Sequence, residues 1–399
     1  MKFYRLTTLF MAFVISATVC AAEVKAAKTN FAAGFFNKWI DSGEYPGAIT
    51  VLYKDGIQEV SCFGWADVDK KIPISMDQIF MQCSQTKGFC GVTVAILIEE
   101  GKISLDDPVY KYLPEYKNLT VRSKDKNGKP ITVPAKNTLT VRMVMNHTGG
   151  LSFEAPSKSK YGWPAIPLRQ AAGESASVPL HFEPGTKEKY SNAGIDVGAA
   201  IVEVVTGKSW DIFLKERVLD PLGMTSSTFK PTDEQLANAI LLYDIKLGQK
   251  AKVRKFHPAM PLPHNGPNVH PSAGAGLWTT ANDQLKFYKM LMNLGVGENG
   301  VRILKEETVK NLLATSTRPA GMEGYSLGLA VNKDGSFGHG GAWGSVCTVN
   351  WQKKQLSLLV IQVLGNYTLM RNNLSHAANK FFATEIDTSG VDAYTGRME

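Results

Sequence analysis

A serine and a lysine three residues apart, Ser84 and Lys87, open the long apolar run from Phe89 to Glu100. On a helix, residues three apart share a face, so the lysine amine can contact the serine hydroxyl. A hydroxyl needs an adjacent proton acceptor to become a nucleophile, and a lysine whose pKa is lowered by burial can serve. The positive field at a helix N-terminus favours the developing alkoxide. The pair therefore predicts acyl transfer through Ser84.

The same Ser-x-x-Lys spacing also occurs at Ser123, Ser157 and Ser227. These three serines lie in polar or Pro-rich surroundings, which are typical of solvated surface. Only Ser84 precedes a long apolar helix. Taken alone, Ser84 has a second interpretation as a helix-capping serine beside a surface lysine.

Two further motifs carry groups that could take part in such chemistry. In Tyr190-Ser191-Asn192 the outer residues project the same way from an extended loop, so a phenol and a carboxamide can face one site. The phenol can act as general acid or base if a lysine favours its phenolate, and the amide can bind a substrate carbonyl. The similar Tyr116-Lys117-Asn118 borders a lysine-rich loop, and we predict that it lies on the surface.

The third motif is the glycine-rich stretch from Gly338 to Gly344, which contains His339, Gly341 and Ala342. Its glycines let the backbone approach a ligand closely, and its N–H groups could form half of an oxyanion hole. The alternative is a glycine-rich turn with a structural histidine.

The elements that must position these motifs lie at both ends of the chain. Strands are predicted near each terminus, and most helices are predicted between them. The first two strands are joined by an Asp55-Gly56 hairpin turn. The predicted strands are 48–53, 59–66, 325–332, 344–351 and 355–363, and the predicted helices are 31–42, 84–100, 143–146, 193–206, 211–219, 281–294 and 370–382. This order predicts an α/β (α+β) fold, an antiparallel sheet with flanking helices and an inserted, mostly helical domain. Segments 117–138, 152–180 and 231–271 are predicted as loops, the first a solvated loop or hairpin.

The composition and the N-terminal residues indicate what class of protein the chain belongs to and where it is located. The 399 residues are 44% hydrophobic and 20% charged, as in a globular protein. Residues 1–22 have the pattern of a cleaved signal peptide, which predicts a periplasmic or secreted protein; a lipoprotein anchored through Cys20 is less favoured because Val19 is bulky. No later run reaches the ~18 apolar residues of a membrane span. Removal of the leader lowers the net charge from +8 to +6. The lysine-rich loop lacks the aromatic pattern of a nucleic-acid surface.

Cysteine and histidine spacing indicates no metal site and no cofactor. Cys83 and Cys90 would be about 10 Å apart on one helix, too far for a disulfide, whereas a Cys62–Cys347 bridge stays open. His257, His264 and His270 are interpreted as solvated residues of a Pro-rich loop. There is no Gly-x-Ser-x-Gly elbow of an α/β-hydrolase.

The order Ser84-x-x-Lys87, Tyr190-x-Asn192, His339-Gly340-Gly341 resembles that in penicillin-recognising serine hydrolases: class C β-lactamases, D-alanyl-D-alanine carboxypeptidases and related esterases. Further matches are the motifs at 101–108, 146–151, 183–185 and 221–224, so the resemblance covers about 30–382. It implies a hydrolase domain at 23–385, with a sheet subdomain (about 30–100 and 275–382), a helical subdomain (about 101–274) and a tail at 386–399.

The resemblance also implies roles for the motif residues. Ser84 would be acylated, Lys87 and Tyr190 would move protons, and Asn192 would bind the substrate amide or carbonyl. His339 would stand at a strand edge in the substrate site with Gly341 and Ala342, and the N–H groups of Ser84 and Ala342 would hold the oxyanion.

One departure bears on the substrate. β-Lactamases of this group usually carry a lysine where this chain has His339, and a largely neutral imidazole attracts a substrate carboxylate less. We therefore expect an esterase or D-amino-acid peptidase or carboxypeptidase, acting on small esters, amides or cell-wall-type peptides. The alternatives are a β-lactamase or a catalytically inactive penicillin-binding-like protein. The motifs do not specify the natural substrate or the oligomeric state.

Overall fold

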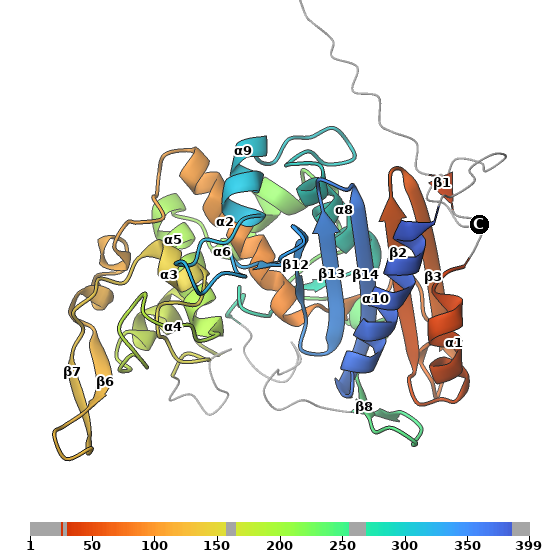
Figure 1. The fold of residues 1–399 in the computed structure, drawn as a ribbon, viewed down its shortest axis with the longest axis horizontal. Coiled ribbons are helices and arrows are strands. Elements are labelled where there is room, and N and C mark those ends of the chain that lie inside the picture. Colours follow the sequence, from red (N-terminus) through yellow and green to blue (C-terminus); the bar gives the residue numbers. More distant parts are fainter. Residues whose placement is uncertain (1–24, 27–29, 157–164, 255–268, 385–399) are drawn as a thin grey trace, which may run out of the picture.

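The computed structural model describes residues 25–26, 30–156, 165–254 and 269–384, and its main feature is one large sheet (Figure 1). The sheet joins both ends of the chain through the pairing of β2 with β14. Its strands run in the order β1 (Lys25–Ala26), β3 (Ile57–Asp67), β2 (Gly47–Lys54), β14 (Gln355–Gly365), β13 (Gly344–Asn350), β12 (Phe337–Gly340) and β11 (Ala330–Val331). From β3 to β11 the pairing is antiparallel, which confirms the predicted fold class.

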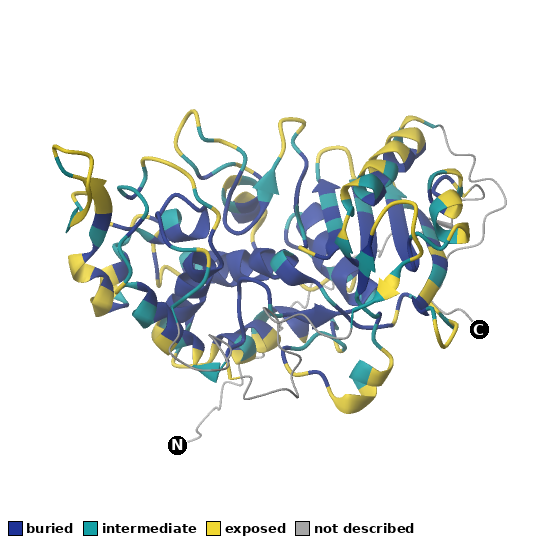
Figure 2. Cartoon of the chain, turned by 90° about the horizontal axis from the view of Figure 1, so that it is seen from below, coloured by how far each residue is buried: buried dark blue, intermediate teal, exposed yellow. Residues whose placement is uncertain are grey.

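Helices cover both faces of this sheet because its central strand is apolar on both sides. Along β14, Leu358 and Val360 join one hydrophobic core, whereas Leu359 and Ile361 join another. This alternation follows the two-residue period of a strand. Helices α1 (Ala33–Asp41) and α10 (Thr368–Ala383) cover the second core, and α2 (Thr86–Glu99) and α8 (Ala281–Met292) lie on the first. Figure 2 shows the buried interior between the exposed outer elements.

The middle of the chain builds the other part of the molecule around α5 (Asn192–Thr206), which packs on α2, α3 and α4. The predicted hairpin after Lys117 forms as β6 and β7 and projects from this part (Figure 1). The remaining elements are β4 (Ile72–Pro73), β5 (Phe80–Met81), η1 (Cys83–Gln85), η2 (Val109–Lys111), η3 (Pro114–Asn118), β6 (Thr120–Lys124), β7 (Pro130–Pro134), α3 (Val141–Met145), α4 (Leu168–Ser175), α6 (Trp210–Leu214), η5 (Lys215–Leu219), α7 (Asp233–Ala237), β8 (Tyr243–Ile245), β9 (Lys252–Val253), β10 (Trp278–Thr279), α9 (Glu306–Thr308) and η6 (Val309–Leu313).

The predicted strand 325–332 is wrong, since only Ala330–Val331 is a strand there. The reason is close packing against α2, whose Gly88 and Gly91 leave room for this segment. A Cβ atom on Gly91 would lie 1.9 Å from the Leu327 carbonyl oxygen, and one on Gly88 would lie 2.6 Å from the Leu329 side chain. The alternating apolar residues of 325–332 therefore pack against the helix that follows Ser84.

Other corrections concern the predicted loops and cysteines. Segment 152–180 contains helix α4, and segment 231–271 contains α7 and the β8–β9 pair, with β8 parallel to β14. The helix predicted at 211–219 is α6 followed by the π-helical turn η5. Cys62 and Cys347 are both free, on strands separated by β2 and β14, so the open disulfide does not form.

Among the described residues, no helix is both long and apolar enough to cross a bilayer. The predicted leader 1–22, the tail 386–399, and His257 and His264 lie outside the described residues.

Candidate active site

Ser84 lies in the short turn η1, which leads directly into α2. The residue before it, Cys83, has a left-handed backbone with φ 51°, a strained conformation for a non-glycine residue. Ser84 is half-buried, and Lys87 follows one helical turn later with its side chain fully buried. The Lys87 Nζ lies 3.1 Å from the Ser84 Oγ, which confirms the contact predicted from the spacing.

The Lys87 amine has two other, shorter contacts. Its Nζ lies 2.6 Å from the Asn192 Oδ1 and 2.6 Å from the Gly274 carbonyl oxygen. Both of these atoms only accept hydrogen bonds, so a neutral amine would donate its two hydrogens to them. Its lone pair would then face the Ser84 hydroxyl. The geometry suits a base that takes the serine proton.

The pKa of Lys87 permits this neutral form. Burial lowers the pKa to about 7, although the charges of Asp196 and Glu154 act in the opposite direction. Near neutral pH, a substantial part of the protein therefore carries an uncharged amine beside Ser84.

Tyr190 lies over the same amine, with the Lys87 Nζ 4.5 Å from its ring centroid. The residue is 37% exposed, and its hydroxyl contacts the Ser84 side chain. Burial raises the pKa of Tyr190 above its usual value, and the contact with Ser84 only partly offsets this. The phenol therefore stays protonated near neutral pH, so it suits a proton donor; the sequence-based idea of a phenolate base is not favoured.

Asn192 connects the lysine to a carboxyl group that the sequence analysis missed. While its Oδ1 accepts from Lys87, its Nδ2 donates to the Glu154 Oε1 at 2.6 Å. Glu154 follows the His147-to-Leu151 motif by three residues, but nothing in the spacing indicated which way it would face. Burial raises the pKa of Glu154 to about 7.

Asp196 is a second acidic residue that sequence reasoning missed. It lies one turn after Asn192 on α5, so its spacing could have placed it on the same face. Its carboxylate accepts from the Gly274 N–H at 3.0 Å and lies 3.2 Å from the His270 Nε2. His270 is thus buried and partnered, and its interpretation as a solvated residue is wrong.

His339 belongs to strand β12 and not to a turn. Its Nδ1 lies 2.7 Å from the Gly340 carbonyl oxygen and therefore donates to it, which leaves Nε2 to accept from the Tyr325 hydroxyl at 2.9 Å. Burial, helped by the charge of Lys87, lowers the pKa of His339 to about 3. This agrees with the predicted neutral imidazole, and both ring nitrogens have hydrogen-bond partners.

Gly341 and Ala342 lie between β12 and β13 and against the turn that holds Ser84. Ala342 is exposed, and the N–H groups of Trp343 and Ala342 interact with the Cys83 thiol next to Ser84. Gly341 packs so tightly that a Cβ atom would lie 2.5 Å from the Gln82 carbonyl oxygen. The structure therefore shows Gly341 packed against the turn that holds Ser84, and the oxyanion role of Ala342 stays a prediction.

Replacing Gly341 by alanine is expected to destabilise the protein by about 1–3 kcal/mol, because the added methyl group must displace backbone beside Ser84. Gly34 in α1 is the matched control, since a Cβ atom there has nothing within 4 Å. Gly34→Ala should be neutral or slightly stabilising. Thermal unfolding of both variants measures the difference, and equal melting temperatures would contradict the packing argument.

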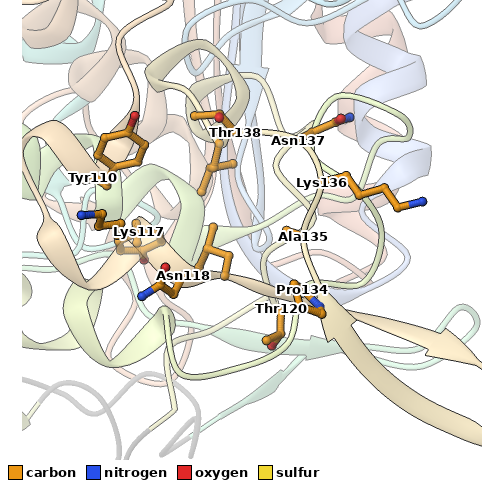
Figure 3. A pocket seen from close by; sticks show the side chains of 12 residues that line it. Tyr110, Lys117, Asn118, Thr120, Pro134, Ala135, Lys136, Asn137 and Thr138 are labelled. Carbon is orange, nitrogen blue, oxygen red and sulfur yellow. The ribbon is translucent and has the colours of Figure 1, made fainter.

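A separate pocket lies near the β6–β7 hairpin (Figure 3). The second Tyr-x-Asn motif lines it with Tyr116, Lys117 and Asn118. Lys117 and Asn118 are exposed, as predicted for this motif. Tyr116 is instead buried and donates to the Ala172 carbonyl oxygen at 2.7 Å, so the predicted surface position is wrong for the tyrosine. Neither Ser84 nor Lys87 lines this pocket. Tyr116 is therefore a packing residue of the core, away from the candidate active site.

Comparison with known proteins identifies the family. The family model described as Beta-lactamase matches residues 30–371. The chain belongs to the β-lactamase family. Among curated relatives, Protein Rv1367c of Mycobacterium tuberculosis is 31% identical over 277 residues, 68% of each chain.

Solved structures show the same fold. Simvastatin synthase (LovD) from Aspergillus terreus superposes with a TM-score of 0.73 at 20% identity, over 89% of this chain and 98% of that one. EstCE1, described as a hydrolase with promiscuous acyltransferase activity, has a TM-score of 0.67 at 21% identity, over 87% and 97%. These neighbours share the fold of this chain at low sequence identity.

Proposed function

We propose that this member of the β-lactamase family is a serine hydrolase that forms an acyl-enzyme on Ser84. The observation that carries the proposal is the arrangement of Lys87, whose two short contacts leave one position on its amine for the Ser84 hydroxyl. Its pKa of about 7 allows that amine to be neutral at the pH where it must accept a proton.

The proposed reaction has two steps. In the first, the Ser84 Oγ bonds to the substrate carbonyl carbon while its proton passes to the Lys87 Nζ. The bond to the leaving group then breaks, and the leaving group takes a proton from Tyr190, whose raised pKa keeps the phenol protonated. The Lys87 ammonium then passes the proton that it took from Ser84 to the Tyr190 phenolate. In the second step, water loses a proton to Lys87, attacks the acyl carbon and releases the acid, and Ser84 regains its proton. No metal or cofactor is required.

Within this class we favour an esterase or D-amino-acid peptidase over a β-lactamase. The neutral, fully hydrogen-bonded His339 gives little attraction for a substrate carboxylate. The description of EstCE1 as a hydrolase with acyltransferase activity supports acyl transfer on this fold. We also keep the proposal that residues 1–22 export the protein to the periplasm or outside the cell.

Three substrates assayed side by side test this preference: a short-chain nitrophenyl ester, a D-alanyl peptide and nitrocefin. We expect turnover of the ester or the peptide to exceed that of nitrocefin. Fast nitrocefin turnover with poor ester cleavage would overturn the preference. Absence of turnover on all three, together with no labelling of Ser84, would favour an inactive binding protein.

A further inference from the structure

Three basic side chains of this part of the molecule, His339, Arg371 and Arg318, already have partners. His339 uses both ring nitrogens, as described above. Arg371 donates to three backbone carbonyl oxygens, those of Gly341, Gly344 and Ser345. Arg318 pairs with Glu188 and donates to the Asn146 carbonyl oxygen. A substrate carboxylate would have to displace one of these interactions.

Beside Asn192, which contacts Lys87, the structure presents an acceptor, the carboxyl group of Glu154. The backbone at 152–154 runs along the 190–192 segment: the Ser191 Oγ donates to the Ser152 carbonyl oxygen at 2.6 Å, and the Asn192 N–H donates to the Phe153 carbonyl oxygen at 2.8 Å. These bonds fix the loop beside Tyr190 and Asn192. Glu154 is thereby held with its Oε1 on the Asn192 amide.

The half-buried position of Glu154 favours binding of a cationic group by its carboxylate. One N–H of the Asn192 amide, a group otherwise suited to a substrate carbonyl, is occupied by Glu154. A charge-assisted bond from an ammonium group to a carboxylate is stronger than a neutral one, and partial burial reduces its screening. Burial raises the pKa of Glu154 to about 7, and a bound cation would favour its ionised form. Lys87, Asp196 and His270 are the other charged or titratable groups that act on it.

We propose that Glu154 forms a subsite for a protonated amino group on the acyl part of the substrate. The site would then select amine-bearing esters or amides, such as aminoacyl compounds, over neutral and anionic ones. This inference rests on the proposed acyl transfer at Ser84 and specifies its substrate class. The competing interpretation is that Glu154 only positions Asn192 and makes no contact with substrate.

The test uses two isosteric ligands, alanine p-nitroanilide in its D and L forms and isobutyric p-nitroanilide, in which a methyl group replaces the ammonium. Binding is measured by calorimetry on full-length Ser84→Ala at about pH 7, where the α-amino group of the alanine compound is mostly protonated and its binding would favour the ionised form of Glu154. We expect one enantiomer of the alanine compound to bind roughly tenfold to hundredfold more tightly than the isobutyric compound. Adding Glu154→Gln should remove that difference. Adding Glu216→Gln, an exposed carboxylate paired with Lys208, should preserve it.

Two results would overturn the subsite: equal binding of the isosteres by Ser84→Ala, or a difference that persists with Glu154→Gln. Equal weakening of both ligands by Glu154→Gln would assign the residue to positioning Asn192 alone. Because binding is measured without the nucleophile, these outcomes can be read even if the intact protein hydrolyses neither compound. A failure of the proposed hydrolysis is thus distinguishable from a failure of the subsite.

Discussion

Replacing Ser84 by alanine is expected to abolish labelling by a fluorophosphonate and to lower kcat/KM for a short-chain ester by about 10⁴-fold or more. The reason is that the variant has no oxygen on which the acyl group can form, while the rest of the site keeps its hydrogen bonds. In-gel fluorescence and a steady-state assay measure the two effects.

Ser123→Ala is the matched control, because Ser123 has the same Ser-x-x-Lys spacing and lies exposed in the β6–β7 hairpin. It should retain both labelling and turnover. If the Ser84→Ala variant is labelled as strongly as the unmodified protein, Ser84 is not the nucleophile, and the chain is better described as a binding protein of this family.

Replacing Lys87 by methionine is expected to lower kcat/KM by about 10²- to 10⁴-fold, because the site loses its proton acceptor while the buried volume is nearly kept. In the unmodified protein the lysine must be neutral to accept the serine proton. With a pKa of about 7, its neutral fraction grows as the pH rises through 7, so kcat/KM should rise over the same range. A pH–rate profile measures this limb.

The pH dependence of the free energy of unfolding provides an independent check on the Lys87→Met variant. In the unfolded chain the lysine has its ordinary pKa of 10.5, whereas in the folded protein it loses its proton near 7. The unfolded state therefore binds more protons between these values, and this residue makes the free energy of unfolding rise with pH across that window. The methionine variant should lack this contribution in denaturant unfolding. A variant that keeps the acid limb of the rate profile would show that another group is the base.

Much of the fold followed from local patterns. The Asp55-Gly56 turn predicted the first hairpin, and both residues have positive φ as such a turn requires. The apolar run after Ser84 predicted the central helix, and glycine after Thr206 predicted the end of α5. Segment 325–332 misled for a physical reason, since its alternating apolar residues pack on the glycines of α2 instead of pairing in the sheet.

The reactive groups, Ser84, Lys87, Tyr190, Asn192 and His339, could be chosen from residue type, spacing and order along the chain. Ser84 and Lys87 are separated by a single helical turn, so their contact could be predicted from local spacing.

Residue types and local spacing were enough to select the side chains that could carry acyl chemistry and to predict a helix that holds the first two together. The state of the lysine depends on long-range contacts, because its two acceptors come from residues 105 and 187 positions away. The same holds for Glu154 and Asp196, which reach the site through long-range hydrogen bonds. Burial and distant charges set a pKa, and neither is written in the local pattern of residues.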